Sequence, residues 1–237
     1  MDDDEIRQWE EILMLSYQND QSLIEASTNE INNVLQTNEC VDIFIGILMQ
    51  SHEAIVRNAA SIYLFKAIKL RIRMIPIKKR MKICSFILDC IGGNDINDVI
   101  LGNFIGVISL MAEKMHKLFP EVEHFIDEIE HDSNLVRLLL LVNVLPFLKN
   151  DYIEPRYLLF SNIAVNLLMI DNWEMIFNAI KLIKILLNAS KNLSGFEKAF
   201  DRIGQLCYAI LNENETSQNK FWNEIGELIN VGVFPND

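Results

Sequence analysis

Apolar segments with helical spacing recur along this chain in pairs, and the step from one pair to the next is nearly constant. One apolar residue near the start of the second segment marks four successive pairs: Val56, Val99, Val136 and Ile176. These positions lie 43, 37 and 40 residues apart. Such a period is typical of helical hairpins that stack side by side, each burying the apolar face of its neighbour. Six pairs are expected, near 4–18 and 22–36, 39–50 and 53–73, 78–92 and 95–117, 121–131 and 133–149, 154–170 and 172–190, and 196–213 and 217–231.

The turn-forming residues are scarce, with 9 Gly and 5 Pro among 237 residues. An all-β chain needs many more turns, whereas long helices with short connections do not. Half of the residues are hydrophobic, which is enough for a sizeable core. The predicted fold is therefore all-α, a right-handed α–α superhelix of HEAT or armadillo type with about five to six hairpins. We expect residues 1–237 to form one such solenoid.

Two of the second helices open with the same dipeptide, at Val56-Arg57 and Val136-Arg137. These openings are 80 residues apart, which is two periods. Valine at this place is expected to point into the core, and the arginine, about 100° further round the helix, to reach the preceding turn or a neighbour's carbonyls. A Val-Arg opening is usual for the second helix of a HEAT repeat.

Three stretches carry a resemblance to a known family. They are Ile24 to Leu35, then Phe44 to Leu48 with Val56 to Lys69, and finally Ile105 to Ala112 with Phe119-Pro120-Glu121 and Ser133 to Leu148. In order and spacing they resemble the first four HEAT repeats of the importin-β (karyopherin) family of nuclear transport receptors. The resemblance covers about residues 5–150, and further helical repeats are expected over about 151–232. Family members are several times longer, and the tryptophan that flanks their phenylalanine–proline turn is absent here.

This resemblance implies a receptor that binds a Ran-type small GTPase, basic cargo proteins and Phe-Gly nucleoporins, in the cytoplasm and nucleus and without a cofactor. In the family, Ran packs on the inner second helices of the first repeats. By position, the corresponding exposed residues here are Asn29, Asn33, Arg57, Asn58, Ser61 and Lys66. The alternative function is a generic HEAT-repeat scaffold or adaptor that does not bind Ran.

The net charge of −12 predicts repulsion from nucleic-acid backbones, so nucleic acid is not an expected partner. One stretch, from Lys66 to Lys82, is nevertheless strongly basic. Its candidate docking residues are Lys69, Arg71, Arg73, Lys78, Lys79 and Arg80. Such a patch suits an acidic protein or an acidic lipid. The other interpretation is that these cations satisfy a helix C-terminus and cover apolar surface with their aliphatic stems.

Signatures of catalysis are missing from the sequence. Gly92-Gly93 is not part of a phosphate-binding loop, no GxSxG motif occurs, and none of the four cysteines forms a CxxC pair. His124 and His131 lie seven residues apart and fit an alternative metal-binding helical protein, although surface histidines explain them more simply. We therefore expect no enzyme, no metal and no cofactor. No apolar run reaches the length of a membrane span.

The last segment, from Phe221 to Asp237, is more apolar than the exposed end of a solenoid should be. The apolar residues there are Trp222, Ile225, Leu228, Ile229, Val231, Val233 and Phe234. Either this segment folds back on the preceding hairpin, which we favour, or it is left for a partner or a second copy of the chain.

Overall fold

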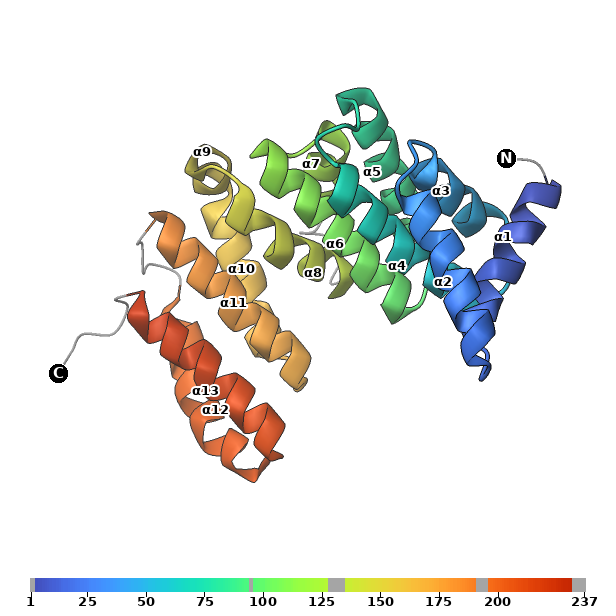
Figure 1. The fold of residues 1–237 in the computed structure, drawn as a ribbon. Coiled ribbons are helices and arrows are strands. Elements are labelled where there is room, and N and C mark those ends of the chain that lie inside the picture. The colour runs from blue at the N-terminus through green and yellow to red at the C-terminus, as the bar shows by residue number, and fades with distance from the viewer. Residues whose placement is uncertain (1–2, 94–95, 128–134, 191–195, 232–237) are drawn as a thin grey trace. The chain divides into compact units, whose positions relative to one another are not determined.

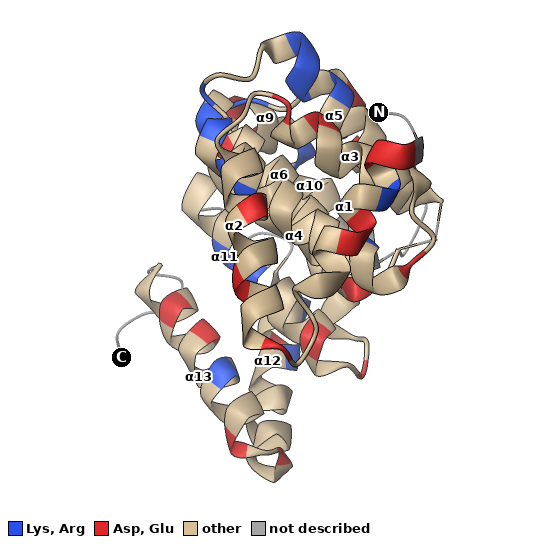
Figure 2. Cartoon of the chain, turned by 45° about the vertical axis from the view of Figure 1, so that its right-hand side comes forward, with Lys and Arg blue, Asp and Glu red and all other residues tan. Residues whose placement is uncertain are grey.

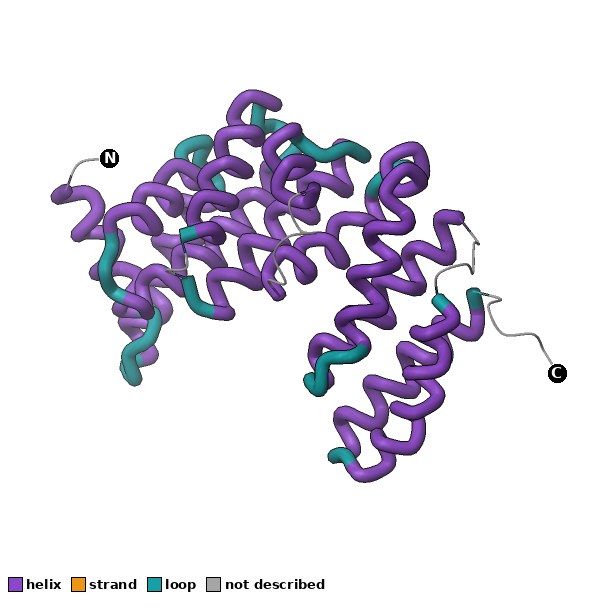
Figure 3. Tube along the Cα trace, turned by 180° about the vertical axis from the view of Figure 1, so that it is seen from behind, coloured by secondary structure: helices purple, strands orange, loops and turns teal. Residues whose placement is uncertain are grey.

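The computed structural model describes residues 3–93, 96–127, 135–190 and 196–231, and the regular structure in these ranges is entirely helical (Figure 3). The predicted all-α class and its helical-repeat architecture are therefore confirmed. The chain divides into two compact units, residues 1–114 and residues 115–237. The prediction that both belong to one solenoid over residues 1–237 stays a prediction.

The first unit consists of three successive helical hairpins (Figure 1). Their helices are α1 (Asp3–Leu15) and α2 (Gln21–Leu35), α3 (Cys40–Gln50) and α4 (Ala54–Arg71), and α5 (Ile77–Gly92) and α6 (Asp98–Met115). The expected pairs are thus found within a few residues of their predicted ends.

The core of the first unit lies between the hairpins and is built from large side chains with no exposed surface. Phe44, Leu64 and Ile87 are 0% exposed, and Phe104 is 1% exposed. Val56 is also 0% exposed, which confirms that the valine of the first Val-Arg opening points into the core. Burial of this kind stabilises the stack by about 1.5–3 kcal/mol for each large side chain.

The second unit contains the remaining hairpins, with short helical segments between them. Its α-helices are α7 (Pro120–Asp127), α8 (Leu135–Val144), α9 (Asn150–Ile153), α10 (Tyr157–Leu168), α11 (Trp173–Ser190), α12 (Glu197–Ala209) and α13 (Glu215–Asn230). Three 3₁₀ segments accompany them: η2 (Leu145–Phe147), η3 (Glu154–Arg156) and η4 (Ile210–Asn212). The α-helix α8 ends before Pro146, because proline lacks the amide hydrogen and clashes with the preceding turn.

Helix α11 forms the centre of the second unit, since it packs on α8, α10 and α13. The C-terminal helix α13 folds back onto α11 and buries Phe221, Ile225 and Leu228, as predicted. Trp222 and Ile229 on the same helix remain 42% and 44% exposed. Val233 and Phe234 lie outside the described residues.

No single helix of the described chain has the length and hydropathy that a membrane span needs. Helices α6 and α7 reach those limits only when they are counted together.

Candidate functional site

Polar side chains join the second helices of neighbouring hairpins in the first unit. Nδ2 of Asn97 donates a hydrogen bond to Oδ1 of Asn58 across 2.8 Å, just before α6 begins. Further along, Nδ2 of Asn103 donates to Oγ of Ser61 across 3.0 Å, and that hydroxyl in turn donates to the Asn58 carbonyl at 2.7 Å. The two contacts between helices link residues 39 and 42 positions apart. They therefore hold α4 and α6 together one repeat period apart.

The same spacing is found between other elements within each unit. Lys79 at the start of α5 forms a 2.6 Å ion pair with Asp42 on α3, 37 residues away. In the second unit, Asn150 donates to the carbonyl of Ala189, which is 39 residues away. Contacts about one period apart are what a stack of hairpins produces, because each hairpin packs on the next one.

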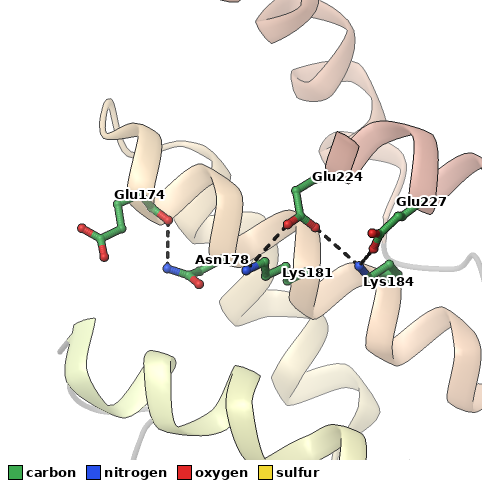
Figure 4. Close-up of polar contacts among 6 residues, drawn as sticks. All are labelled: Glu174, Asn178, Lys181, Lys184, Glu224 and Glu227. Atoms are coloured by element: carbon green, nitrogen blue, oxygen red, sulfur yellow. Dashed lines mark hydrogen bonds and ion pairs between the residues drawn. The ribbon is translucent and has the colours of Figure 1, made fainter. Parts of the chain in front are cut away.

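An ion-pair cluster fastens α13 to α11 (Figure 4). Both Lys181 and Lys184 reach the carboxylate of Glu224, at 3.6 Å and 3.4 Å, and Lys184 also contacts Glu227. Nδ2 of Asn178, on the same face of α11, donates to the backbone carbonyl of Glu174. Glu224 is the most buried of the four charged residues, with 13% of its side chain exposed. The cluster is thus a structural clamp for the final helix.

The clamp changes the pKa values of its members. The hydrogen bond and the charge of Lys184 lower the pKa of the Glu227 carboxyl. Burial tends to lower the pKa of Lys184, but the bond to Glu227 and the charge of Glu224 outweigh it, so this pKa is raised. Both shifts favour the charged forms, as expected for an ion pair that contributes to stability.

Only some of the six residues predicted to bind a partner are exposed to solvent. Asn29 and Asn33 on α2 are exposed, and so is Lys66, whose ammonium lies 4.8 Å from the centre of the Tyr63 ring. Arg57 and Asn58 are half-buried, and Ser61 is 0% exposed. The expected exposure of Ser61 is therefore wrong, because its hydroxyl is enclosed in the contact between α4 and α6. The role of these residues in binding a partner stays a prediction.

The predicted basic patch also divides into two groups. Three of its cations are engaged within the first unit: Arg71 donates to the Gln36 carbonyl at 2.9 Å, Lys79 pairs with Asp42, and Arg80 donates to the Ile75 carbonyl at 2.8 Å. The other three are exposed, and these are Lys69, Arg73 and Lys78. Figure 2 shows the basic residues gathered where α5 begins.

Two cavities of the described parts illustrate what surrounds them. In the first unit, one of about 370 Å³ is lined by Ile6, Arg7, Glu10, Gln50, His52 and Glu53. In the second, one of about 510 Å³ lies between α10 and α12 and is lined by Leu159, Asn162, Ile163, Val165, Asn166, Glu197 and Lys198. Neither combines a nucleophile with a base at bonding distance.

Metal-binding residues are not grouped in the described part of the chain, where no three His, Cys, Asp or Glu side chains are close enough to hold an ion. His124 is exposed on α7, whereas His131 lies outside the described residues. The alternative of a metal site at this histidine pair is therefore not tested.

Sequence reasoning missed two sets of residues. Asn97 and Asn103, which bind the α4 side chains, could have been found by searching one period downstream of Asn58 and Ser61. Three exposed apolar residues within the basic stretch, Leu70, Met74 and Ile77, were also missed. In the sequence these three residues could have been found because they alternate with the cations between the end of α4 and the start of α5.

Comparisons with known proteins give no assignment. No protein-family model matches the sequence, and no curated protein matches it. Similar solved structures include that of an engineered protein, which is 11% identical over 94% of this chain and 97% of that chain, with a TM-score of 0.46. A likeness this distant assigns neither a family nor a function.

Proposed function

We propose that this chain is a non-catalytic helical-repeat protein that binds other proteins along the exposed faces of its second helices. The observation that carries the proposal is the set of contacts one period apart, in which Asn97 meets Asn58 and Asn103 meets Ser61. These bonds join α4 to the residue before α6 and to the first turns of α6. Stacked helices held in this way offer an extended binding surface, which is how helical-repeat proteins engage partners.

More specifically, we propose that the chain acts as a nuclear transport receptor. Such a receptor binds a Ran-type GTPase, basic cargo and Phe-Gly nucleoporins. This proposal rests on the resemblance to the importin-β family, and the exposed side chains of Asn29, Asn33 and Lys66 are available for it. The acidic chain, with a net charge of −12, suits basic cargo because opposite charges steer association.

A generic scaffold that does not bind Ran is the second candidate. Two of the six residues assigned to the partner surface favour it, because Asn58 and Ser61 are occupied by bonds to α6. In this version the chain holds fixed partners irrespective of any nucleotide.

A pulldown with Ran locked in its GTP and GDP forms separates the two candidates. The receptor binds the GTP form selectively, and the variant Asn33→Arg with Lys66→Glu weakens that binding by tenfold or more, about 1.4 kcal/mol. Lys149→Glu is the matched control, since Lys149 is exposed in the second unit. Equal or absent binding of both nucleotide forms would rule out the receptor and leave the scaffold.

The scaffold itself is tested by affinity purification from cells, followed by identification of the bound proteins. If the chain is a scaffold, the same partners should co-purify in stoichiometric amounts with either nucleotide. These partners should no longer co-purify when the exposed α2 and α4 residues are changed. Purification of the chain without any partner would reject it. Solution mass measured on the purified chain tests the alternative of an oligomer formed through α13, where Trp222 and Ile229 are exposed.

A further inference from the structure

The most unusual distribution of charge in this chain is a long segment without acidic residues. Between Glu53 and Asp89 there are nine Lys or Arg residues and no Asp or Glu, in a chain that holds 21 basic and 33 acidic residues overall. The segment covers α4, α5 and the corner between them. Charge segregated this strongly attracts an anionic surface locally, even though the whole protein is acidic.

The corner between α4 and α5 also exposes apolar side chains. Leu70, Met74 and Ile77 are 61%, 63% and 53% exposed. The exposed cations Lys69, Arg73 and Lys78 alternate with them, and no hydrogen bond or ion pair within the described residues holds these cations. Apolar side chains that project between cations are the composition that protein segments use at the interface of a membrane.

Buried anchors and a guanidinium hold this corner in place. Ile72 and Ile75 are 3% and 7% exposed, so the corner is attached to the core on its inner side. The Arg80 side chain donates to the carbonyls of both residues. These carbonyls follow the end of α4, where backbone acceptors have no partner in the helix. The outer side chains are therefore presented by a fixed turn, and ordering them on contact costs little conformational entropy.

From these observations we propose that the α4–α5 corner, residues 69–78, docks on the surface of an anionic lipid membrane. Leu70, Met74 and Ile77 enter the headgroup region, while Lys69, Arg73 and Lys78 contact lipid phosphates and carboxylates. Leu70, Met74 and Ile77 are each more than half exposed, so they are available to a soft, deformable surface. A fluid bilayer accommodates projecting side chains, whereas an acidic peptide needs a shaped pocket for them. Nucleic acid would neutralise the cations but offers no apolar region for the three apolar side chains.

Co-sedimentation of the full chain with vesicles tests this proposal. The probe is a phosphatidylcholine vesicle with or without phosphatidylserine. Binding is expected only with phosphatidylserine, and it should weaken strongly from ~0.1 M to ~1 M salt, where the Debye length falls from ~10 Å to ~3 Å. Each cation near an anionic surface strengthens partitioning about fivefold. The variant Lys69→Gln with Arg73→Gln should therefore bind about 25-fold more weakly.

A second variant tests the apolar contribution. Leu70→Ser, Met74→Ser and Ile77→Ser together should lower partitioning by at least tenfold, because exposed side chains are removed and the buried anchors are kept. The matched controls lie in the second unit: Lys149→Gln with Lys198→Gln, and Leu158→Ser with Leu211→Ser, all at exposed positions. Circular dichroism of each variant establishes that it is folded.

Two results would overturn the proposal. One is equal binding of wild type, corner variants and controls, and the other is no binding to phosphatidylserine vesicles. Selective binding of an acidic, apolar peptide instead of vesicles would also reject the lipid and assign the corner to a protein partner. Lipid binding does not depend on the Ran or scaffold experiments, so failure of either proposal leaves the other standing.

Discussion

Asn97 donates a 2.8 Å hydrogen bond to Asn58, which lies 39 residues earlier in the chain, and Oδ1 of Asn97 also accepts from the amides of Val99 and Ile100. One side chain thus caps the start of α6 and connects that helix to the preceding hairpin. Because Asn97 has both roles, substitutions of this residue can measure how much the contact between neighbouring hairpins contributes to stability.

A double-mutant cycle at this pair should separate the two roles. Asn58→Ala removes only the contact between helices and should lower the free energy of unfolding by about 1 kcal/mol. Asn97→Ala removes the cap as well and should cost about 2 kcal/mol. The coupling energy, from urea unfolding, should be about 0.5–1 kcal/mol. Asn143→Ala is the control, because that exposed side chain donates only within α8, to Leu139. Strictly additive losses at Asn58 and Asn97 would contradict the contact.

Two glycines of α6 should respond differently to alanine. A Cβ at Gly102 meets no atom within 4 Å, so Gly102→Ala should stabilise the chain by about 0.5–1 kcal/mol through helix propensity. A Cβ at Gly106 would lie 3.1 Å from the ring of Phe65 on α4, so crowding should cancel most of that gain. Thermal unfolding of the two variants side by side measures the difference. If Gly106→Ala were the more stable one, the close approach of α4 and α6 would be disproved.

Removing Lys184 should loosen the C-terminal helix. Lys184→Met leaves the largely buried carboxylate of Glu224 with the more distant Lys181 as its cation, and should cost about 1–2 kcal/mol. Hydrogen exchange of the α13 amides should become faster, while that of α3 and α4 in the first unit stays unchanged. Lys198→Met is the control, since Lys198 is exposed on α12 and lies outside the contact between α11 and α13. Unchanged exchange in α13 would show that apolar burial alone holds the helix.

The pH dependence of this clamp follows from its pKa shifts. Because the pKa of Glu227 is lowered from 4.5, its contribution is present above pH 4.5 and is lost as pH falls further. Because the pKa of Lys184 is raised from 10.5, its contribution is present below pH 10.5 and is lost as pH rises through the folded value. Exchange of α13 measured across pH, corrected for intrinsic rates, should show greatest protection between these limits. Lys184→Met should remove the alkaline loss attributed to this group.

Tyr152 should ionise only at strongly alkaline pH. Burial raises its pKa to about 12, which outweighs the opposing charge of Arg156. Neutral Tyr152 thus favours the folded chain below pH 10, and this contribution falls as pH rises from 10 towards 12. Spectrophotometric titration of wild type against Tyr152→Phe isolates the group. A difference curve centred near pH 10 would contradict the burial of its ring.

The sequence was sufficient to predict the repeated helical hairpins, but it did not predict the contacts between neighbouring hairpins. Periodicity predicted the hairpins, and the apolar residues of the last segment predicted that it folds back, as Ile225 and Leu228 do. Periodicity could not place Ser61, because the buried stripe of α4 is broad enough to include it. Its hydroxyl is satisfied by the carbonyl of Asn58, so a small polar residue can lie inside without cost.

The basic stretch from Lys66 to Lys82 shows a similar limit to prediction from the sequence. A count of cations cannot tell which of them are occupied by a neighbouring carbonyl or carboxylate. Arg80 donates to carbonyls of the corner and Lys79 pairs with Asp42 on α3, whereas Arg73 and Lys78 are exposed. This division depends on where α3 and the end of α4 lie, and local sequence does not specify that geometry. The roles proposed for these residues remain predictions.

Because α13 is fastened to α11 by one flank of apolar residues and one group of charges, it is the natural place for this unit to open. Detaching it would bring Phe221 and the inner face of α11 into contact with water while the packing of α10 on α11 survived. Heat or denaturant would then unfold the unit stepwise from its C-terminal side. This is expected where each hairpin is stabilised mainly by contacts with the adjacent hairpin.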